Sequence, residues 1–572
     1  MRRIGSEFRR LVVHAAEYMC MLYKSDRELG EMVTDPLLPR SETAQAQPSR
    51  RARPSWGGSI HAQEDLALSP VELVSMEVLL TGGTGFVGKS VLLHLCSEPP
   101  AVVRRVHLLI RPGGSGQSAE ARFNQLLASS AFDSLPQGWT HRVSVQGGDV
   151  ALPGLGCTAE AISALSESIT HIVHCAATIE FDLPLREAAA LNVGGTLNML
   201  EFAHSCVNGR RLIYCSSAYA SPLTEEPILE ELPRFTAAQQ LADPDELYSL
   251  MMSDTLSPLD TLALLRNSGH PNTYTLTKCV AELLLAKRRR EHIALSIVRP
   301  SIIGCAALRP FPGWNTSKSG IAAFAYLVRL GALHTISGLP NSTLDCVPVD
   351  VVAARIVAEA TADAVFACSP RGDVYDSIPL LGRLLKVAAP PPPPPPSPPL
   401  TITHVVAGRQ HSVTIKEVVM HMCGVFSSAS GPLGPAFIRV IAPKRTLAQS
   451  LSVRRDLIAV DLRWALAALL GQRRLGAQAR LMRERMLKLH DAFEHFTHKP
   501  YDFRMAAATE PFDRIRCLEL LAKAVDDHVA SRLPASKAQW HLSRLPLMWA
   551  LTALALIMTA LAAVGATRHL PV

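Results

Sequence analysis

Two side chains four positions apart, Tyr274 and Lys278 in the segment Tyr-Thr-Leu-Thr-Lys, are of the types that carbonyl reduction needs. On a helix, such residues lie on the same face. A phenol can donate a proton to the oxygen that gains charge as hydride arrives. A neighbouring ammonium lowers the pKa of that phenol and can also hold the ribose of a nicotinamide cofactor. We therefore predict Tyr274 and Lys278 as catalytic residues that also contact the cofactor.

A third group should hold the substrate oxygen. The run from Leu212 to Tyr219 is apolar at its start and then contains Ser216 and Ser217. If this run is a strand of a parallel sheet, the two serines lie at its carboxyl end, where ligands bind in open α/β sheets. We favour Ser217 as the catalytic partner of Tyr274, with Ser216 as the next choice. The alternative is that these hydroxyl groups only cap the end of the strand.

A glycine-rich turn lies about 190 residues before the Tyr–Lys pair, directly after an apolar run. We predict that it binds the cofactor through Thr81, Gly82, Gly83, Thr84, Gly85, Phe86, Val87 and Gly88. Its three spaced glycines permit a tight turn, a close approach of the backbone to a pyrophosphate, and close packing of the following helix on the strand. The pyrophosphate would face the helix N-terminus.

The same turn also satisfies the phosphate-loop pattern, because Gly83 is followed by Gly88, Lys89 and Ser90 in the spacing G-x4-G-K-S. An NTPase is therefore an alternative. No apolar strand downstream ends in a clear magnesium-binding aspartate, so the dinucleotide site is favoured. The second apolar run ends in Ile110 and Arg111 without an adjacent acid. An arginine at this position suits the 2′-phosphate of NADP, so we predict NADPH as the cofactor and Arg111 as a ligand.

Elements that can position these residues recur along the chain as short apolar runs between helical stretches. The runs are 78–80, 106–110, 169–175, 212–215 and 295–298. Continuously apolar strands that alternate with helices indicate a parallel sheet covered on both faces. The predicted fold class is therefore α/β, with a doubly wound parallel Rossmann sheet.

The remaining regions differ in composition, and we divide the chain accordingly. The predicted parts are an N-terminal extension or linker (1–70), an NADP-binding Rossmann reductase domain (71–430) with a proline-rich insertion at about 376–400, a smaller mainly helical domain (444–530), and a transmembrane helix (545–567). The last of these has no charged residue between Arg544 and Arg568 and is long enough to span a bilayer. Only five residues follow it, so we expect a tail anchor that leaves the bulk of the chain in the cytosol.

Charge and cysteine content exclude other classes. The formal net charge of +7 is modest for 572 residues, so no nucleic-acid partner is expected. The twelve cysteines show no CxxC pair and no metal-ligand spacing, so we predict no metal site.

Four segments together resemble the fatty acyl-CoA reductase family, whose enzymes are of the extended short-chain dehydrogenase/reductase type. They are Tyr274 to Lys278, 299–304 (Arg-Pro-Ser-Ile-Ile-Gly), 310–314 (Pro-Phe-Pro-Gly-Trp) and 347–350 (Val-Pro-Val-Asp). The resemblance covers roughly residues 77–430 and fades towards the C-terminus. It implies NADPH-dependent reduction of a long-chain fatty acyl-CoA to a fatty alcohol through an aldehyde. It also implies the positions of further cofactor-binding residues: Asp149 near the adenine, Ala176 and Ala177 along the cofactor cleft, Asn192 in support of the active site, and Pro300 and Ser301 on either side of the nicotinamide.

Two other functions remain open at this stage. One is a membrane-bound sterol or other carbonyl dehydrogenase of the same fold, and the other is a non-enzymatic scaffold that recruits partners through its proline run. The expected partners are the fatty acyl-CoA substrate and a lipid bilayer, with a homodimer also considered. The resemblance and the expected tail anchor together point to a peroxisomal or endoplasmic reticulum membrane, with a plastid as the alternative.

Overall fold

The computed structural model describes the residues from Ser75 to Arg532 with gaps. The described ranges are 75–114, 116–223, 226–234, 243–317, 320–329, 333, 335–368, 400–430, 439–441, 495–499, 501–506 and 511–532. The N-terminal extension 1–70, the insertion at about 376–400 except its last residue, and the transmembrane segment 545–567 lie outside these ranges. So does most of the predicted helical domain 444–530. Within the described ranges, no helix is both long and apolar enough to cross a bilayer.

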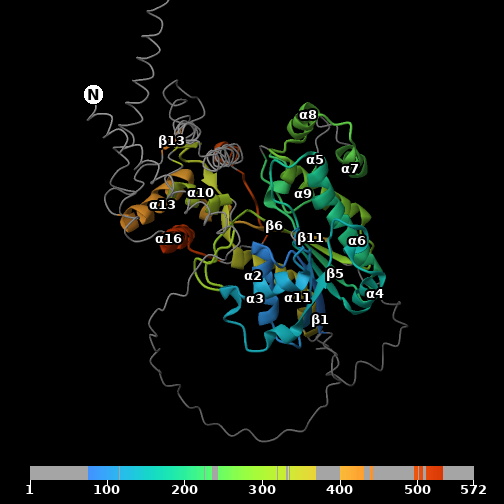
Figure 1. The fold of residues 1–572 in the computed structure, drawn as a ribbon. Helices are drawn as coiled ribbons and strands as arrows, with labels where there is room; N and C mark the ends of the chain where they lie inside the picture. Colours follow the sequence, from blue (N-terminus) through green and yellow to red (C-terminus); the bar gives the residue numbers. More distant parts are fainter. Residues whose placement is uncertain are drawn as a thin grey trace, which may run out of the picture.

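A seven-stranded parallel sheet forms the centre of the molecule (Figure 1). Its spatial order is β11-β6-β5-β4-β1-β2-β3. The strands are β1 (Met76–Thr81), β2 (Val103–Ile110), β3 (Val143–Gly147), β4 (His171–His174), β5 (Arg211–Cys215), β6 (Ala294–Pro300) and β11 (Leu400–Val405). The order reverses between β1 and β4, and this switch point is where an open α/β sheet binds ligands. The predicted doubly wound parallel sheet is confirmed.

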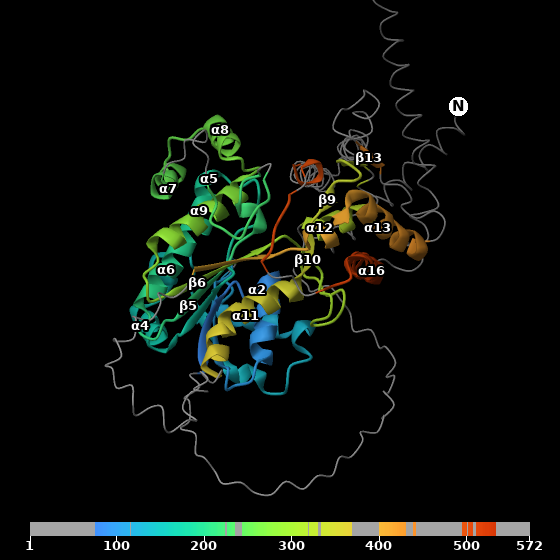
Figure 2. The same cartoon turned by 180° about the vertical axis from the view of Figure 1, so that it is seen from behind.

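Helices cover both faces of the sheet (Figures 1 and 2). One face carries α2 (Phe86–Ser97), α3 (Ala119–Leu127) and α11 (Val349–Cys368), and the other carries α4 (Ala159–Ser168), α6 (Gly195–Ser205) and α9 (Thr273–Arg288). Three further helices, α5 (Leu185–Ala189), α7 (Pro244–Met252) and α8 (Pro258–Ser268), lie beside α9. This arrangement leaves the carboxyl ends of the strands as the open edge.

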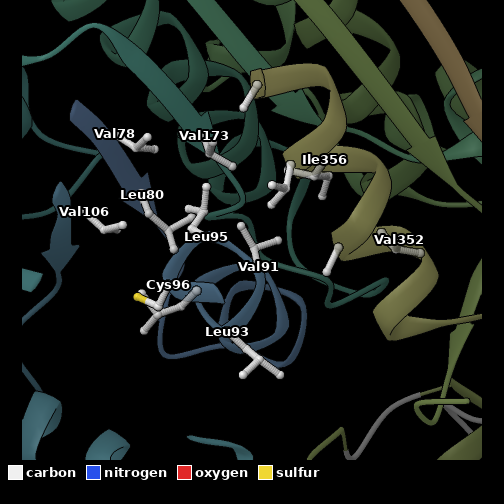
Figure 3. Close-up of a cluster of buried hydrophobic side chains, with 14 of the residues drawn as sticks. Val78, Leu80, Val91, Leu93, Leu95, Cys96, Val106, Val173, Val352 and Ile356 are labelled. Carbon is white, nitrogen blue, oxygen red and sulfur yellow. The ribbon is translucent and has the colours of Figure 1, made fainter. Parts of the chain in front are cut away.

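Alternation along β1 shows why its sequence is continuously apolar. Val78 and Leu80 pack against α2 and α11, as Figure 3 shows, whereas Leu79 packs into the cluster on the opposite face. All three are fully buried. A strand covered on both faces gains from apolar side chains at every position, so its sequence lacks the polar alternation of a half-exposed strand.

A second group of elements packs beside the sheet, near the carboxyl ends of its strands. It contains α10 (Gly320–Arg329), α12 (Gly408–His411), α13 (Ile415–Ser430) and α16 (Arg514–Arg532), with the short strands β7 (Ile302–Gly304), β8 (Thr335–Ser337), β9 (Thr343–Leu344), β10 (Cys346–Pro348), β12 (Val413–Thr414) and β13 (Arg439–Ile441). Helix α16 packs on both α13 and α10 and also contacts β7 and β10. Residues far apart in sequence therefore share one core beside the open edge.

Candidate functional site

The turn after β1 has the backbone shape that its glycines predict. Gly82 has a φ of +72°, and a Cβ built there would lie 2.7 Å from the carbonyl carbon of Cys175. A Cβ on Gly88 would lie 2.1 Å from the carbonyl oxygen of Gly82. Neither position accepts a side chain, whereas Gly85 has only one neighbour, the Gly82 oxygen at 3.2 Å. The turn is thus a cradle made of backbone, open at Gly85, and it leads directly into α2.

The phosphate-loop alternative does not fit this geometry. Ser90, whose hydroxyl would have to reach a magnesium ion, is fully buried inside α2. The cradle therefore fits a dinucleotide and not a nucleoside triphosphate with its metal. Within the described residues, no group of three His, Cys, Asp or Glu side chains is placed to hold a metal ion.

Thr81 connects the turn to the end of β4. Its hydroxyl forms a hydrogen bond of 2.8 Å with Nδ1 of His174 and accepts one of 3.2 Å from the N–H of Ala176. Burial lowers the pKa of His174 to about 3, so its ring is neutral. The pair of alanines predicted to line the cleft, Ala176 and Ala177, thus begins at a residue fixed directly to the glycine turn.

At the end of β2, two arginines lie close together. Arg111 is largely exposed, and its guanidinium is 4.0 Å from a carboxylate oxygen of Asp149. Arg122, on α3, donates to the carbonyl oxygen of Arg111 and, over 3.2 Å, to the hydroxyl of Thr84. Burial and the neighbouring Arg111 both lower the pKa of Arg122. Two cations beside the turn are unfavourable for each other and fit a site that receives an anionic group. Sequence reasoning named Arg111 and Asp149 but missed Arg122.

Tyr274 lies in the first turn of α9. Asn272 caps this helix by accepting a hydrogen bond of 2.9 Å from the N–H of Thr275. The Ser217 hydroxyl accepts from the N–H of Tyr219 over 3.3 Å, and its interaction with the Tyr274 phenol lowers the pKa of that phenol. Ser217 thus both caps the short turn after β5 and contacts Tyr274.

The pKa of Tyr274 departs from our expectation. Burial raises it above the ordinary value, Cys215 adds to the rise, and the interaction with Ser217 opposes it. The expected lowering by Lys278 is wrong in this structure. The Lys278 ammonium instead donates to the carbonyl oxygen of Cys215 over 2.8 Å and lies 4.6 Å from the centre of the Tyr214 ring. Tyr274 is therefore a neutral phenol, the form that donates a proton.

Lys278 is itself almost fully buried, with 3% of its surface exposed. Burial lowers its pKa, while Cys215, Cys175 and Glu282 act in the opposite direction. Its contacts place the ammonium at the carboxyl end of β5, between the glycine turn and α9.

Asn192 lies in a π-helical turn, Ala190–Gly194, between α5 and α6. Its side-chain oxygen accepts from the N–H of Thr178 over 2.9 Å, and its NH₂ group donates to Thr277 over 3.0 Å. The Asn192 amide thereby joins the loop after β4 to the helix that carries Tyr274. π-turns inside helices are frequent at functional sites.

Ser216 does not share the role of Ser217. Its hydroxyl donates to Glu282, which forms an ion pair with Arg299 at 2.5 Å. Both charged side chains are fully buried, and Arg299 also donates to the carbonyl oxygens of Leu229 and Glu231. Glu282 is two helical turns beyond Tyr274 on α9. This ion pair fixes α9, the end of β5 and the loop 226–234 together.

Two family-like segments near the cleft have structural roles. Both carboxylate oxygens of Asp350 accept hydrogen bonds, from the N–H groups of Ala307, Leu308 and Arg309 at 2.8–2.9 Å. Asp350 therefore holds the loop that leads to Trp314. Trp314 is buried and packs on Phe86, at the end of the glycine turn, with ring centres 5.3 Å apart.

The residues at the end of β6 lie at the same open edge. Pro300 pairs with Val405 of β11, and the N–H of Ser301 donates to the Val405 carbonyl oxygen over 3.1 Å. Both are thereby placed at the carboxyl end of the sheet, beside the Glu282–Arg299 pair. No contact among the described residues joins them directly to Tyr274.

An aromatic cluster lies next to Tyr274. Its ring contacts run from Tyr274 to Phe181 (5.6 Å), from Phe181 to Phe496 (6.4 Å), and from Phe496 to Tyr219 (4.8 Å). Tyr501 and Phe503 also pack on Tyr219. In the sequence, the segment around 496–503 lies where the family resemblance fades towards the C-terminus. The structure joins it to Tyr274 through the ring of Phe181.

Fold and site together define a Rossmann-type dinucleotide-binding domain with a tyrosine–lysine pair in its crevice. Residues 80–356 match the family model described as male sterility protein. Relatives include fatty acyl-CoA reductase 1 of Gallus gallus, 33% identical over 50% of this chain and 54% of its own length. Fatty acyl-CoA reductase 1 of Homo sapiens is 32% identical over 48% and 52% of the two chains. The chain thus spans about half the length of the curated relatives that it matches.

A solved structure shares the fold. The terminal R domain from the myxalamid PKS-NRPS biosynthetic pathway aligns with a TM-score of 0.50 and 19% identity. The alignment covers 80% of this chain and 94% of that domain. At this identity, the likeness establishes the architecture alone.

Proposed function

We propose that the chain is an NADPH-dependent reductase that converts a long-chain fatty acyl-CoA into a fatty alcohol through an aldehyde. The observation that carries this proposal is the Tyr274–Ser217 pair, which lies beside Lys278 at the carboxyl ends of the strands. Its relatives are named fatty acyl-CoA reductases, which supports the substrate class.

The neutral state of Tyr274 suits the role of a proton donor. Burial keeps the proton on the phenol, and reduction of a carbonyl needs such a donor beside the substrate oxygen.

The residues present fit the cofactor. The backbone cradle from Gly82 to Gly88 accepts a pyrophosphate, and Arg111 with Arg122 provides positive charge for the 2′-phosphate that distinguishes NADPH from NADH. Asp149 lies beside Arg111, where it would contact the adenine. When bound, NADPH supplies the hydride that reaches the substrate carbonyl carbon.

The chain's own groups then act on the substrate oxygen. Ser217 and Tyr274 donate hydrogen bonds to it as its negative charge develops, and Tyr274 transfers its proton. The resulting thiohemiacetal collapses to an aldehyde with loss of the thiol, and a second round on the aldehyde gives the alcohol. Lys278 holds the ribose hydroxyls, and the buried Glu282–Arg299 pair keeps α9 in register with β5.

The test is product analysis with acyl-CoAs of medium to very long chain length and purified full-length protein. We expect NADPH oxidation and fatty alcohol formation. Tyr274→Phe should lower the turnover rate by about 10²- to 10⁴-fold, the usual contribution of a general acid, while NADPH binding persists. Tyr248→Phe, on α7, is the matched control and should keep its rate.

Other outcomes would redirect the proposal. NADPH binding without turnover of any acyl-CoA would point to a different carbonyl substrate, such as a sterol ketone. Absence of NADPH binding would favour a scaffold. An aldehyde that accumulates as the end product would limit the reaction to its first stage.

We also propose that residues 545–567 anchor the protein in a membrane, with the reductase domain in the cytosol. The proposal is supported by a run of 23 residues without a charged side chain, bounded by Arg544 and Arg568. Imaging of the full-length protein beside a variant that lacks residues 545–572 tests it. We expect the full-length protein on peroxisomes or the endoplasmic reticulum and the variant in the cytosol. An unchanged membrane distribution would contradict the anchor.

A further inference from the structure

Two half-buried cysteines, Cys175 and Cys215, lie on the floor of the crevice. They follow β4 and β5, two neighbouring parallel strands in which His174 is paired with Tyr214. The next register position places Cys175 opposite Cys215. The two thiols are close enough for each to shift the pKa of the other. The pair therefore lies side by side across the sheet.

The separation of the two strands suits a disulfide. Neighbouring strands lie about 4.8 Å apart, which falls within the Cα separation of about 4.4–6.8 Å that disulfides span. A disulfide also needs its two Cβ atoms about 3.8 Å apart, which is less than the strand spacing, so the bridge would draw the ends of β4 and β5 together. Both residues are only partly buried, so part of the surface of each remains accessible to solvent.

Local charge makes one of the two thiols nucleophilic. The Cys175 thiol and the nearby Lys278 ammonium lower the pKa of Cys215, although burial opposes them. The Cys215 thiol, together with burial, raises the pKa of Cys175. Cys96, Cys206 and Cys517 differ, because burial raises the pKa of each to about 12. A thiol with a lowered pKa beside a second thiol is the arrangement that reacts with peroxides.

We propose that Cys175 and Cys215 are a peroxide-reactive dithiol whose oxidation to a disulfide switches off the adjacent cofactor site. The Cys215 thiolate attacks hydrogen peroxide, so that an S–O bond forms, the O–O bond breaks and hydroxide leaves. The Cys175 sulfur then attacks the sulfenic acid, so that the S–S bond forms and water leaves. Two thiols and one peroxide give one disulfide and two waters, with two electrons transferred to the peroxide.

The position of the pair explains why the bridge affects the site. The carbonyl oxygen of Cys215 accepts the Lys278 ammonium, and the backbone of Cys175 is the surface against which Gly82 packs. A covalent bridge between these two residues fixes the floor under both the lysine and the glycine turn. Cofactor binding is therefore the property that oxidation alters, and this effect rests on the proposed dinucleotide site. Formation of the disulfide is independent of that proposed site.

The test treats the full-length protein with hydrogen peroxide and maps its peptides by mass spectrometry without reduction. We expect a cross-linked pair of peptides that contain Cys175 and Cys215. NADPH binding, followed by fluorescence, should fall in proportion to the cross-linked fraction, and dithiothreitol should restore it. In Cys175→Ser, which lacks the second thiol, a 1,3-diketone probe should trap the sulfenic acid on Cys215.

Matched variants separate this pair from general oxidation. Cys215→Ser should lose both the cross-link and the peroxide sensitivity, each measured against its own untreated protein. Cys157→Ser should respond like the unaltered protein, because Cys157 is also half-buried but its pKa is raised. Separate alkylation of Cys175 and Cys215 after peroxide would overturn the proposal, as would a cross-link that leaves NADPH binding unchanged. If no reductase activity is found with acyl-CoAs, the peptide map still tests disulfide formation, and the binding assay still tests its effect on NADPH binding.

Discussion

The two ends of the crevice are built in different ways. The end that we propose for cofactor binding, the cofactor end, is a continuous stretch of backbone, Thr81 to Gly88, whose shape depends on positions that accept no Cβ. The end that we propose for the chemistry, the catalytic end, is made of side chains from distant segments, including Asn192, Ser217, Tyr274 and Phe496. At a few positions of the cofactor end, no side chain larger than that of glycine fits. The catalytic end depends on contacts between residues that are far apart in the sequence.

This difference separates two kinds of sensitivity. A substitution in the glycine turn should abolish cofactor binding and leave the catalytic side chains where they are. A substitution in the network behind the catalytic end should lower the stability of the fold itself, because buried charges lose their partners. The following predictions test this division.

The largest expected effect is the loss of NADPH binding in Gly88→Ala. The new Cβ would overlap the carbonyl oxygen of Gly82, which lies 2.1 Å from its position, so the turn must open. Isothermal titration with NADPH measures the loss. Gly424→Ala on α13, where a Cβ meets no neighbour, is the control and should bind NADPH normally. Normal binding by Gly88→Ala would show that the cradle is not the pyrophosphate site.

The next effect concerns the catalytic end. Glu282→Gln leaves Arg299 charged, buried and without its carboxylate, which should lower the free energy of unfolding by about 3–5 kcal/mol. Chemical denaturation of the two proteins measures the change. Asp254→Asn removes an exposed partner of Arg186 and should lower stability by less than about 1 kcal/mol. Equal effects in the two variants would mean that the buried Glu282–Arg299 pair contributes no more to stability than an exposed ion pair.

Arg122→Ala sharpens the comparison at the cofactor end. Loss of one charge-assisted contact, worth about 1.5–3 kcal/mol, should raise the Kd for NADPH by about ten- to a hundredfold. The Kd for NADH should not change, because NADH lacks the 2′-phosphate. Arg266→Ala, on the exposed surface of α8, is the control. An equal rise in the Kd for both cofactors would show that Arg122 does not contact the 2′-phosphate.

The smallest effect is an acid-dependent loss of stability. Burial lowers the pKa of His174 and of His270 to about 3, so both rings are neutral in the fold, whereas the unfolded chain binds protons below about pH 6.5. Their stabilisation is complete above that pH and is lost as the pH falls. At pH 5.5 each histidine should lower the free energy of unfolding by about 1.4 kcal/mol relative to its value well above pH 6.5. Thermal unfolding of His174→Gln and His270→Gln should show a weaker dependence on acid than the unaltered protein.

Sequence reasoning predicted the local structure of the cofactor end, because its signal is local. A strand, three spaced glycines and a helix lie within about twenty residues, and the structure has each of them in place. The helix that carries Tyr274 and Lys278 was also predicted, and their spacing of four places both on one face of it. Glu282 continues that spacing from Tyr274 and Lys278, and this was the available signal for the buried ion pair.

The rest of the catalytic end had no local signal. Phe181 and Phe496 are more than 300 positions apart, and a single aromatic residue in an apolar segment is ordinary. Arg122 is eleven residues beyond Arg111, on a separate helix, and only the fold brings its guanidinium back to Thr84. The pKa of Tyr274 depends on burial, which no spacing of residues reveals.

The π-turn at Ala190–Gly194 contains one residue more than a regular α-helical turn would have at this place. Removal of one residue other than Asn192 from this turn would let the chain run as an uninterrupted α-helix from α5 into α6. The amide of Asn192 would then rotate by about 100° around the helix axis and leave Thr178 and Thr277. The resulting helix would be more regular, but the loop after β4 would lose its hydrogen-bonded connection to α9 through Asn192. A one-residue deletion here should therefore survive in selections for folding and be lost in selections for catalysis.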